Sequence, residues 1–202
     1  MMIQFVILML LAGIFWGIPS FLFGKYKVLY IDYPIQHILW HVVGVSAIYL
    51  LVKDGFDAYF ANTSFWNVIS VILVTSAWML VPIVYKQTGK EYLATKERVA
   101  YQPAKYSEIV LQQVVILGML LILDWKLVTF ALVFFGIHVV AIAFLPKGAF
   151  WSTAPASLFG GIAFAWLQSL GVAGFIASLF IHLAFYATLQ SGVVPGFVPY
   201  KR

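Results

Sequence analysis

Long apolar stretches separated by short polar loops constrain this chain more than any other feature of its sequence. A helix needs about 20 apolar residues to cross a hydrocarbon core about 30 Å thick. Seven stretches approach that length: Met1–Phe23, Ile35–Val52, Trp66–Tyr85, Ile109–Leu123, Leu127–Leu145, Ala154–Leu170 and Val172–Leu189. We therefore predict an all-α fold, a polytopic transmembrane helical bundle with about seven spans.

The composition of the 202-residue chain agrees with this class. Hydrophobic residues make up 63% and charged residues 9% of the chain, whereas roughly a quarter of the residues in a soluble domain are charged. The net charge of +5 comes from the loops, which indicates membrane topology and predicts no nucleic-acid partner. Cysteine is absent, so His, Glu and Asp remain as candidate acid–base groups or metal ligands.

The positions of Lys and Arg predict the orientation. Most of them fall in alternate loops, at Lys25 and Lys27, from Lys86 to Lys105, at Lys147, and at Lys201–Arg202. The intervening loops hold only Lys53 and Lys126. Because cytoplasmic loops carry the excess of basic residues, we expect the N-terminus outside and the C-terminus in the cytoplasm.

The chain is expected to form a single membrane domain over residues 1–202. Residues 1–105 would supply the N-terminal spans and a cytoplasmic loop, and residues 106–190 a core. The polar stretch Lys86–Ser107 is predicted to be a solvated connector or a short interfacial helix. The lack of cysteine and of a targeting extension fits an integral protein of a prokaryotic cytoplasmic (inner) membrane.

A few ionisable residues fall inside the predicted spans. Such groups are costly in a bilayer unless they are paired or hydrated, so each one is a candidate functional residue. Five of them are predicted to gather in the cytoplasmic half, on four different spans: His37, His41, Glu108, His138 and His182. Each could instead serve only as a hydrogen-bonding residue between helices, and His37 and His41 could form a secondary polar layer near the interface.

The order of these residues resembles that in the CPBP family of intramembrane proteases, which includes the type II CAAX prenyl endopeptidases and bacteriocin-processing (Abi-like) proteins. The family has three motifs, Glu-Glu-x-x-x-Arg, Phe-x-x-x-His and His-x-x-x-Asn. Phe134 to His138 matches the second motif, and His182 matches the start of the third. The resemblance covers about Tyr106 to Gln190.

The first and third motifs depart from the family pattern. If Glu108 takes the place of the first glutamate, Gln113 stands where the family has arginine; if it takes the second place, Gln112 does. The first register retains the acid that the chemistry requires, whereas helix geometry favours Gln112 as the residue on the Glu108 face. Tyr186 replaces the asparagine of the third motif.

The resemblance implies an intramembrane peptidase that cuts a membrane-associated peptide or protein near the cytoplasmic face. Glu108 would activate water, His138 and His182 would stabilise the oxyanion, Tyr186 would supply a hydroxyl, and Phe134 would pack against the site. No cofactor is expected. A metal held by Glu108, His138 and His182 is a lower-ranked alternative.

Two other functions remain open from the sequence. The lost arginine, asparagine and second glutamate favour a catalytically degenerate CPBP-type protein that acts as a membrane scaffold or immunity protein. The ionisable residues could also form a relay in a small proton-coupled transporter, although the internal repeats typical of transporters are not visible.

Overall fold

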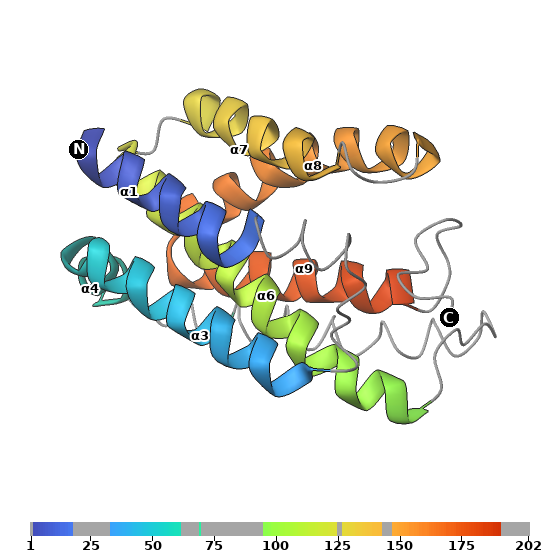
Figure 1. Ribbon diagram of the computed structural model, residues 1–202. Helices are drawn as coiled ribbons and strands as arrows, with labels where there is room; N and C mark the ends of the chain where they lie inside the picture. Colours follow the sequence, from blue (N-terminus) through green and yellow to red (C-terminus); the bar gives the residue numbers. More distant parts are fainter. Residues whose placement is uncertain are drawn as a thin grey trace.

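The computed structural model describes residues 2–17, 33–61, 69, 95–124, 127–142 and 147–190. All the regular secondary structure among these residues is helical. Some side chains within the helices, including those of His138 and Tyr186, also lie outside the described set. Figure 1 shows the arrangement. The α-helices are α1 (Met2–Ala12), α3 (Pro34–Leu51), α4 (Lys53–Ala61), α6 (Thr95–Ile122), α7 (Leu127–Ile142), α8 (Lys147–Ser169) and α9 (Val172–Gln190), and a π-helical segment, Gly13–Gly17, continues α1.

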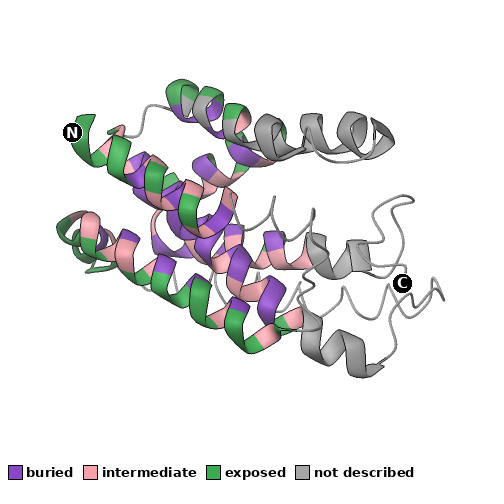
Figure 2. Ribbon diagram, viewed as in Figure 1, coloured by how far each residue is buried: buried purple, intermediate pink, exposed green. Residues whose placement is uncertain are grey.

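Helix α6 is the central element of the bundle. It contacts α1, α3, α8 and α9, and a continuous series of its residues, 111–120, is buried (Figure 2). These residues are almost all apolar, so the helix can be surrounded by other helices without leaving polar groups in the core. Any polar side chain on the buried part of α6 must therefore find a partner on a neighbouring helix or on α6 itself.

Helices α3 and α6 run parallel to each other. His41 contacts Ser107 near the start of the pair, Ile48 faces Gly118 further along, and Gly55, just beyond α3, faces Leu121. Helix α9 runs in the opposite direction to both (Figure 1). The N-terminal parts of α3 and α6 and the C-terminal part of α9 consequently lie toward the same end of the bundle.

The helix boundaries agree with some of the predicted spans and differ from others. Helix α3 corresponds to the predicted span Ile35–Val52, whereas the predicted span Trp66–Tyr85 lies outside the described residues. Helix α6 begins at Thr95, whereas the predicted apolar span begins at Ile109. The polar residues before Ile109 do not belong to an apolar span, but they continue the same helix. The predicted boundary at residue 105 thus falls inside α6. Helix α4 was not predicted from hydropathy.

The connection between α8 and α9 depends on a single glycine. Gly171 has a φ of 90°, a left-handed conformation that glycine adopts without steric cost, and its N–H donates to the carbonyl of Gln168 at 3.1 Å. The hydroxyl of Tyr59 in α4 lies 2.7 Å from the carbonyl oxygen of Gln168 and 2.6 Å from that of Gly171. Tyr59 therefore adds a side-chain contact to two carbonyl groups at the α8–α9 junction, each of which also accepts a backbone N–H. The sequence predicted the division at Gly171.

Large apolar side chains lie exposed on the outer helix faces. On α3, Ile35 is 67% exposed and Leu50 is 69% exposed; on α7, Val128 is 76% exposed. Within the described residues, two helices are long and apolar enough to cross a membrane, Pro34–Leu51 and Gln102–Ile122, and three shorter apolar helices accompany them. Such an extensive apolar surface is unusual for a soluble monomer.

Candidate functional site

Two polar groupings lie on different sides of α6. We call the first the charged cluster; it joins α6 to α3 and consists of Lys105, Ser107, Glu108 and Gln112 with His37 and His41. We call the second the amide network; it joins α6 to α8 and α9 and consists of Gln113, Gln168, Ser178 and His182. The five positions from Glu108 to Gln113 correspond to a rotation of about 140° and a rise of about 7.5 Å, so the two residues face different neighbours at different depths.

Glu108 is the central residue of the charged cluster and is only 4% exposed. The Lys105 ammonium donates to Oε2 of Glu108 at 2.7 Å, and the Gln112 amide donates to Oε1, also at 2.7 Å. Residues three and four positions apart share one face of a helix, which explains why α6 itself can supply both partners. The side chains of Lys105 and Glu108 are 11% and 5% exposed, so this is a buried ion pair.

Two histidines of α3 complete the charged cluster. His37 and His41 are one helical turn apart and buried, with their rings roughly parallel and the ring centres 6.3 Å apart. Nδ1 of His41 lies 2.8 Å from the hydroxyl oxygen of Ser107, and that hydroxyl donates to the carbonyl of Ala104 at 2.7 Å. Because a serine hydroxyl has one proton, Nδ1 of His41 is the donor to Ser107 when that proton is donated to the Ala104 carbonyl. Both imidazoles are within electrostatic range of Glu108.

The amide network contains no carboxylate. Gln168 donates from Nε2 to Oε1 of Gln113 at 2.8 Å, and the Ser178 hydroxyl lies 2.8 Å from the same oxygen. The amide nitrogen of Gln113 lies 2.9 Å from Nδ1 of His182. All four residues are less than 10% exposed, and Gln113, Gln168 and Ser178 are completely buried. Three helices are therefore joined by neutral hydrogen bonds.

The three predicted catalytic residues occupy different places in this arrangement. Glu108 belongs to the charged cluster, and His182 belongs to the amide network, where its ring also packs on Phe164 with the ring centres 5.0 Å apart. His138 lies in α7 and Tyr186 in α9, but their side chains are outside the described set. The structure thus assigns the two possible arginine replacements to different partners: Gln112 binds Glu108, and Gln113 binds His182.

Phe134 packs within the α7–α8 interface. It is 3% exposed, its ring is roughly parallel to that of Phe130 at 5.4 Å between centres, and its edge lies against Gly161 of α8. A Cβ at position 161 would lie 2.3 Å from the Phe134 ring, so glycine is what allows this close approach. The environment of Phe134 is that of a packing residue.

Three residues of the two groupings were not singled out from the sequence, Lys105, Gln168 and Ser178, whereas Ser107 falls at the catalytic position if Glu108 is the second glutamate of the first motif. A local signal existed for Lys105, since a base three positions before an acid on one helix can form an ion pair. No comparable signal existed for Gln168 and Ser178, which meet Gln113 across sequence separations of 55 and 65 residues.

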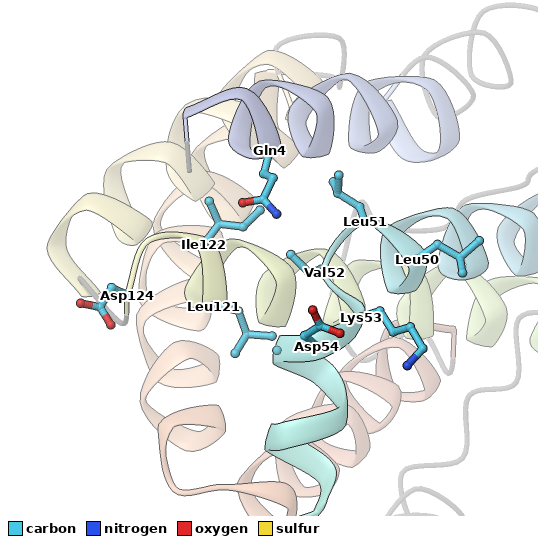
Figure 3. Close-up of a pocket in the computed structure, with 10 residues that line it drawn as sticks. Gln4, Leu50, Leu51, Val52, Lys53, Asp54, Leu121, Ile122 and Asp124 are labelled. Carbon is cyan, nitrogen blue, oxygen red and sulfur yellow. The ribbon is translucent and has the colours of Figure 1, made fainter.

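A separate hollow of about 630 Å³ lies at the other end of α3 and α6 (Figure 3). Its lining includes Gln4, Lys53, Asp54, Leu121 and Asp124, and none of the predicted catalytic residues. Beside it, exposed Lys53 and half-buried Tyr49 donate hydrogen bonds to Asp57. The hydrogen bond from Lys53, followed by that from Tyr49, holds the pKa of Asp57 below its usual value, and burial raises the pKa of nearby Tyr59.

The described side chains do not assemble a metal site. Among them, no group of three His, Asp or Glu residues lies close enough to hold an ion. Because the side chain of His138 is outside this set, the combination of Glu108, His138 and His182 stays a prediction.

Comparisons of the chain with protein-family models, with curated proteins and with solved structures found no match. The resemblance to the CPBP family therefore rests on the three short motifs, their order and their predicted membrane placement.

Proposed function

We propose that this chain is an integral membrane peptidase that hydrolyses a membrane-associated peptide near the cytoplasmic face, with Glu108 as the general base. The observation that carries the proposal is the burial of Glu108, at 4% exposure, on an apolar helix long enough to cross a membrane. A buried carboxylate is costly to maintain, so its presence where the first register of the CPBP motif puts the catalytic acid favours a chemical role.

The membrane assignment is supported by two features. The outer faces of the helices expose large apolar side chains, as a lipid-facing surface would. The parallel course of α3 and α6 is what two spans entering from the same side require. We accordingly propose about seven spans with the N-terminus outside, in a prokaryotic cytoplasmic membrane, with lipid and a peptide or protein substrate as partners.

The proposed reaction uses groups that this chain supplies. The Glu108 carboxylate removes a proton from water while the water oxygen attacks the peptide carbonyl carbon. His138 donates a hydrogen bond to the oxyanion that forms. His182 would be the second donor, which requires the peptide to reach both the α3 side and the α8–α9 side of α6. Glu108 then returns the proton to the amine as the carbon–nitrogen bond breaks, giving a carboxylic acid and an amine. Lys105 compensates the charge of the ionised base in its apolar surroundings.

One observation favours a second candidate, a non-catalytic scaffold or immunity protein with the same fold. Both carboxylate oxygens of Glu108 already accept hydrogen bonds from residues of α6. In that case the charged cluster would serve to hold α3 against α6, and Glu108 would have no substrate to act on.

The discriminating experiment is peptide cleavage by the purified protein in liposomes. Wild type is compared with Glu108→Gln and His182→Ala, and with Asp57→Asn as a control that removes an exposed carboxylate far from the site. Loss of cleavage in the first two variants with retention in the control supports the proposal. Cleavage that survives both Glu108→Gln and His182→Ala would contradict it, and absence of cleavage by folded wild type would favour the scaffold.

A further inference from the structure

We propose that Gln113 and Gln168 fix the tautomer of His182, so that Nδ1 accepts a hydrogen bond and Nε2 carries the proton. The structural part of this inference depends only on the amide network. Its catalytic meaning rests on the proposed peptidase function, in which a neutral His182 must donate to an oxyanion. Gln113 and Gln168 would then be positioning residues that act through His182.

The direction of the network is set by a backbone group that cannot be reversed. Nε2 of Gln168 lies 3.4 Å from the main-chain carbonyl oxygen of Gln113 and 2.8 Å from the Oε1 atom of the same residue. A carbonyl oxygen of the main chain is always an acceptor. The group that faces it must therefore be the NH₂ of Gln168 and not its oxygen.

The orientation of Gln168 determines that of Gln113. Because the Gln168 NH₂ donates toward the end of the Gln113 side chain, the atom that it meets must be the amide oxygen. The Ser178 hydroxyl lies 2.8 Å from this oxygen and 2.8 Å from the Phe175 carbonyl oxygen, so its single proton does not decide the orientation, which rests on the Gln168 contacts. The other end of the Gln113 amide is then NH₂, and it is this group that lies 2.9 Å from Nδ1 of His182.

The reversed network is less favourable. Rotating both amides by 180° would place Oε1 of Gln168 against the Gln113 carbonyl oxygen, so that two acceptors would face each other. It would also move the Gln168 NH₂ to the position now held by Oε1, which has no hydrogen-bond partner among the described residues. An NH₂ buried there would leave two donors of Gln168 without a partner among the described residues, whereas the observed orientation leaves Oε1 of Gln168 and one N–H of Gln113.

The consequence for His182 follows directly. An Nδ1 atom that receives a hydrogen bond from Gln113 holds no proton, so the proton of the neutral ring is on Nε2. The ring is 7% exposed and packs on Phe164 at an angle of 31°. His41 provides the opposite case in the same molecule, because its Nδ1 carries the proton when the Ser107 hydroxyl donates to Ala104.

The test is a long-range ¹H–¹⁵N NMR spectrum of the full chain with ¹⁵N-labelled histidine in detergent micelles. A pH near 8, above the ordinary histidine pKa of about 6.5, keeps the imidazoles neutral. His182→Gln and His41→Gln spectra assign the two rings. We expect His182 protonated at Nε2 only and His41 protonated at Nδ1. A wild-type spectrum with His182 protonated at Nδ1, or with both tautomers, overturns the proposal without any variant having to fold.

The matched variants are Gln168→Met and Gln112→Met. Gln168→Met removes the amide that sets the direction of the hydrogen bonds in the amide network, so a second His182 tautomer should appear. Gln112→Met removes a neighbouring glutamine that binds Glu108 instead, so the His182 signals should not change. An unchanged single tautomer in folded Gln168→Met would show that Gln168 does not fix the His182 tautomer. A changed His182 tautomer in Gln112→Met would show that the tautomer responds to any change in this part of α6.

Catalysis and tautomer are measured separately, so their failures can be told apart. If the peptidase function is correct, Gln168→Met should lower kcat by about two- to tenfold with little change in KM, in proportion to the fraction of His182 left in the competent tautomer. The predicted tautomers without any cleavage would contradict the proposed function alone. Cleavage by a protein whose His182 is protonated at Nδ1 would contradict this inference alone.

Discussion

The charged cluster and the amide network stabilise two sides of the same helix by different means. On the α3 side, a buried lysine and a buried glutamate are neighbours on α6, and His41 of α3 contacts Ser107 between them. On the α8–α9 side, the partners are amides, a hydroxyl and one imidazole drawn from three helices. The first grouping is largely local in sequence, whereas the second is formed almost entirely by long-range contacts.

The two groupings show how a buried helix can keep a charge on one side and only neutral polar groups on another. The ion pair of Lys105 and Glu108 needs no other helix for its principal contacts, so its charges are compensated before α3 packs. The amide network has no internal compensation of that kind, but it also buries no formal charge. Removing one group should therefore have unequal consequences on the two sides.

The largest effect is expected from Lys105→Met. This change leaves the Glu108 carboxylate buried without its cation and should lower the free energy of unfolding by about 3–5 kcal/mol. The measurement is equilibrium unfolding in detergent or bicelles. In the double variant Lys105→Met/Glu108→Gln, which removes both charges, most of the loss should be recovered. A single variant as stable as wild type would show that the buried charge is compensated by other groups.

A smaller effect is expected from Gln113→Met. Methionine keeps most of the side-chain volume but removes the hydrogen bonds to Gln168, Ser178 and His182, for an expected loss of about 1–2 kcal/mol in the same assay. The ratio of the two losses tests the comparison directly. If Gln113→Met were as damaging as Lys105→Met, the presence of a charge would not be what distinguishes the two sides.

Tyr59→Phe should cost about 1 kcal/mol, because it removes one hydroxyl that donates to the carbonyl groups at the end of α8. Its effect should be greatest on amide hydrogen exchange near residues 168–171, next to the amide network, with little change around Glu108. Equal loss of protection on both sides of α6 would mean that the two groupings unfold as one unit.

The smallest effect concerns the exposed pair of Lys53 and Asp57, which matches the buried pair in chemistry and differs from it in exposure. A carboxylate whose pKa is lowered in the folded state stabilises the fold above its unfolded pKa of about 3.9, and this contribution is lost as the pH falls through the folded pKa. Carboxyl ¹³C NMR should give Asp57 a midpoint below the ordinary value. Lys53→Met should raise that midpoint without a measurable change in unfolding at neutral pH. An Asp57 titration midpoint at the ordinary value in wild type would show that the exposed pair does not stabilise the ionised carboxylate.

Hydropathy predicted the helical class and several boundaries, with α3 and the division at Gly171 as the best cases. The long N-terminal extension of α6 could not be predicted in this way, because Thr95–Ser107 contains too many polar residues for an apolar span and yet continues the same helix. Helix α4 was missed for a similar reason, since it is short and contains Lys53, Asp54 and Asp57.

The candidate site was predictable in its individual residues and not in their pairing. The cost of a buried acid singled out Glu108 from the sequence, and the structure does bury it. Which glutamine would bind Glu108 depended on the exact rotation of α6, where helix geometry favoured Gln112 and the family register favoured Gln113. The binding of His182 to Gln113 required knowledge of how α9 packs, and no local pattern contains that information.

The parallel packing of α3 and α6 has a consequence for biosynthesis. His41 and Ser107, which are in contact in the finished protein, are separated by 66 positions in the chain. At a synthesis rate of about 5–20 residues per second, His41 leaves the peptidyl-transferase centre roughly 3–13 s before its partner is made. During that interval the histidines of α3 have neither Ser107 nor the ion pair of α6 beside them. The charged cluster can therefore be completed only once Gln112 is made, and the amide network only once His182 is made.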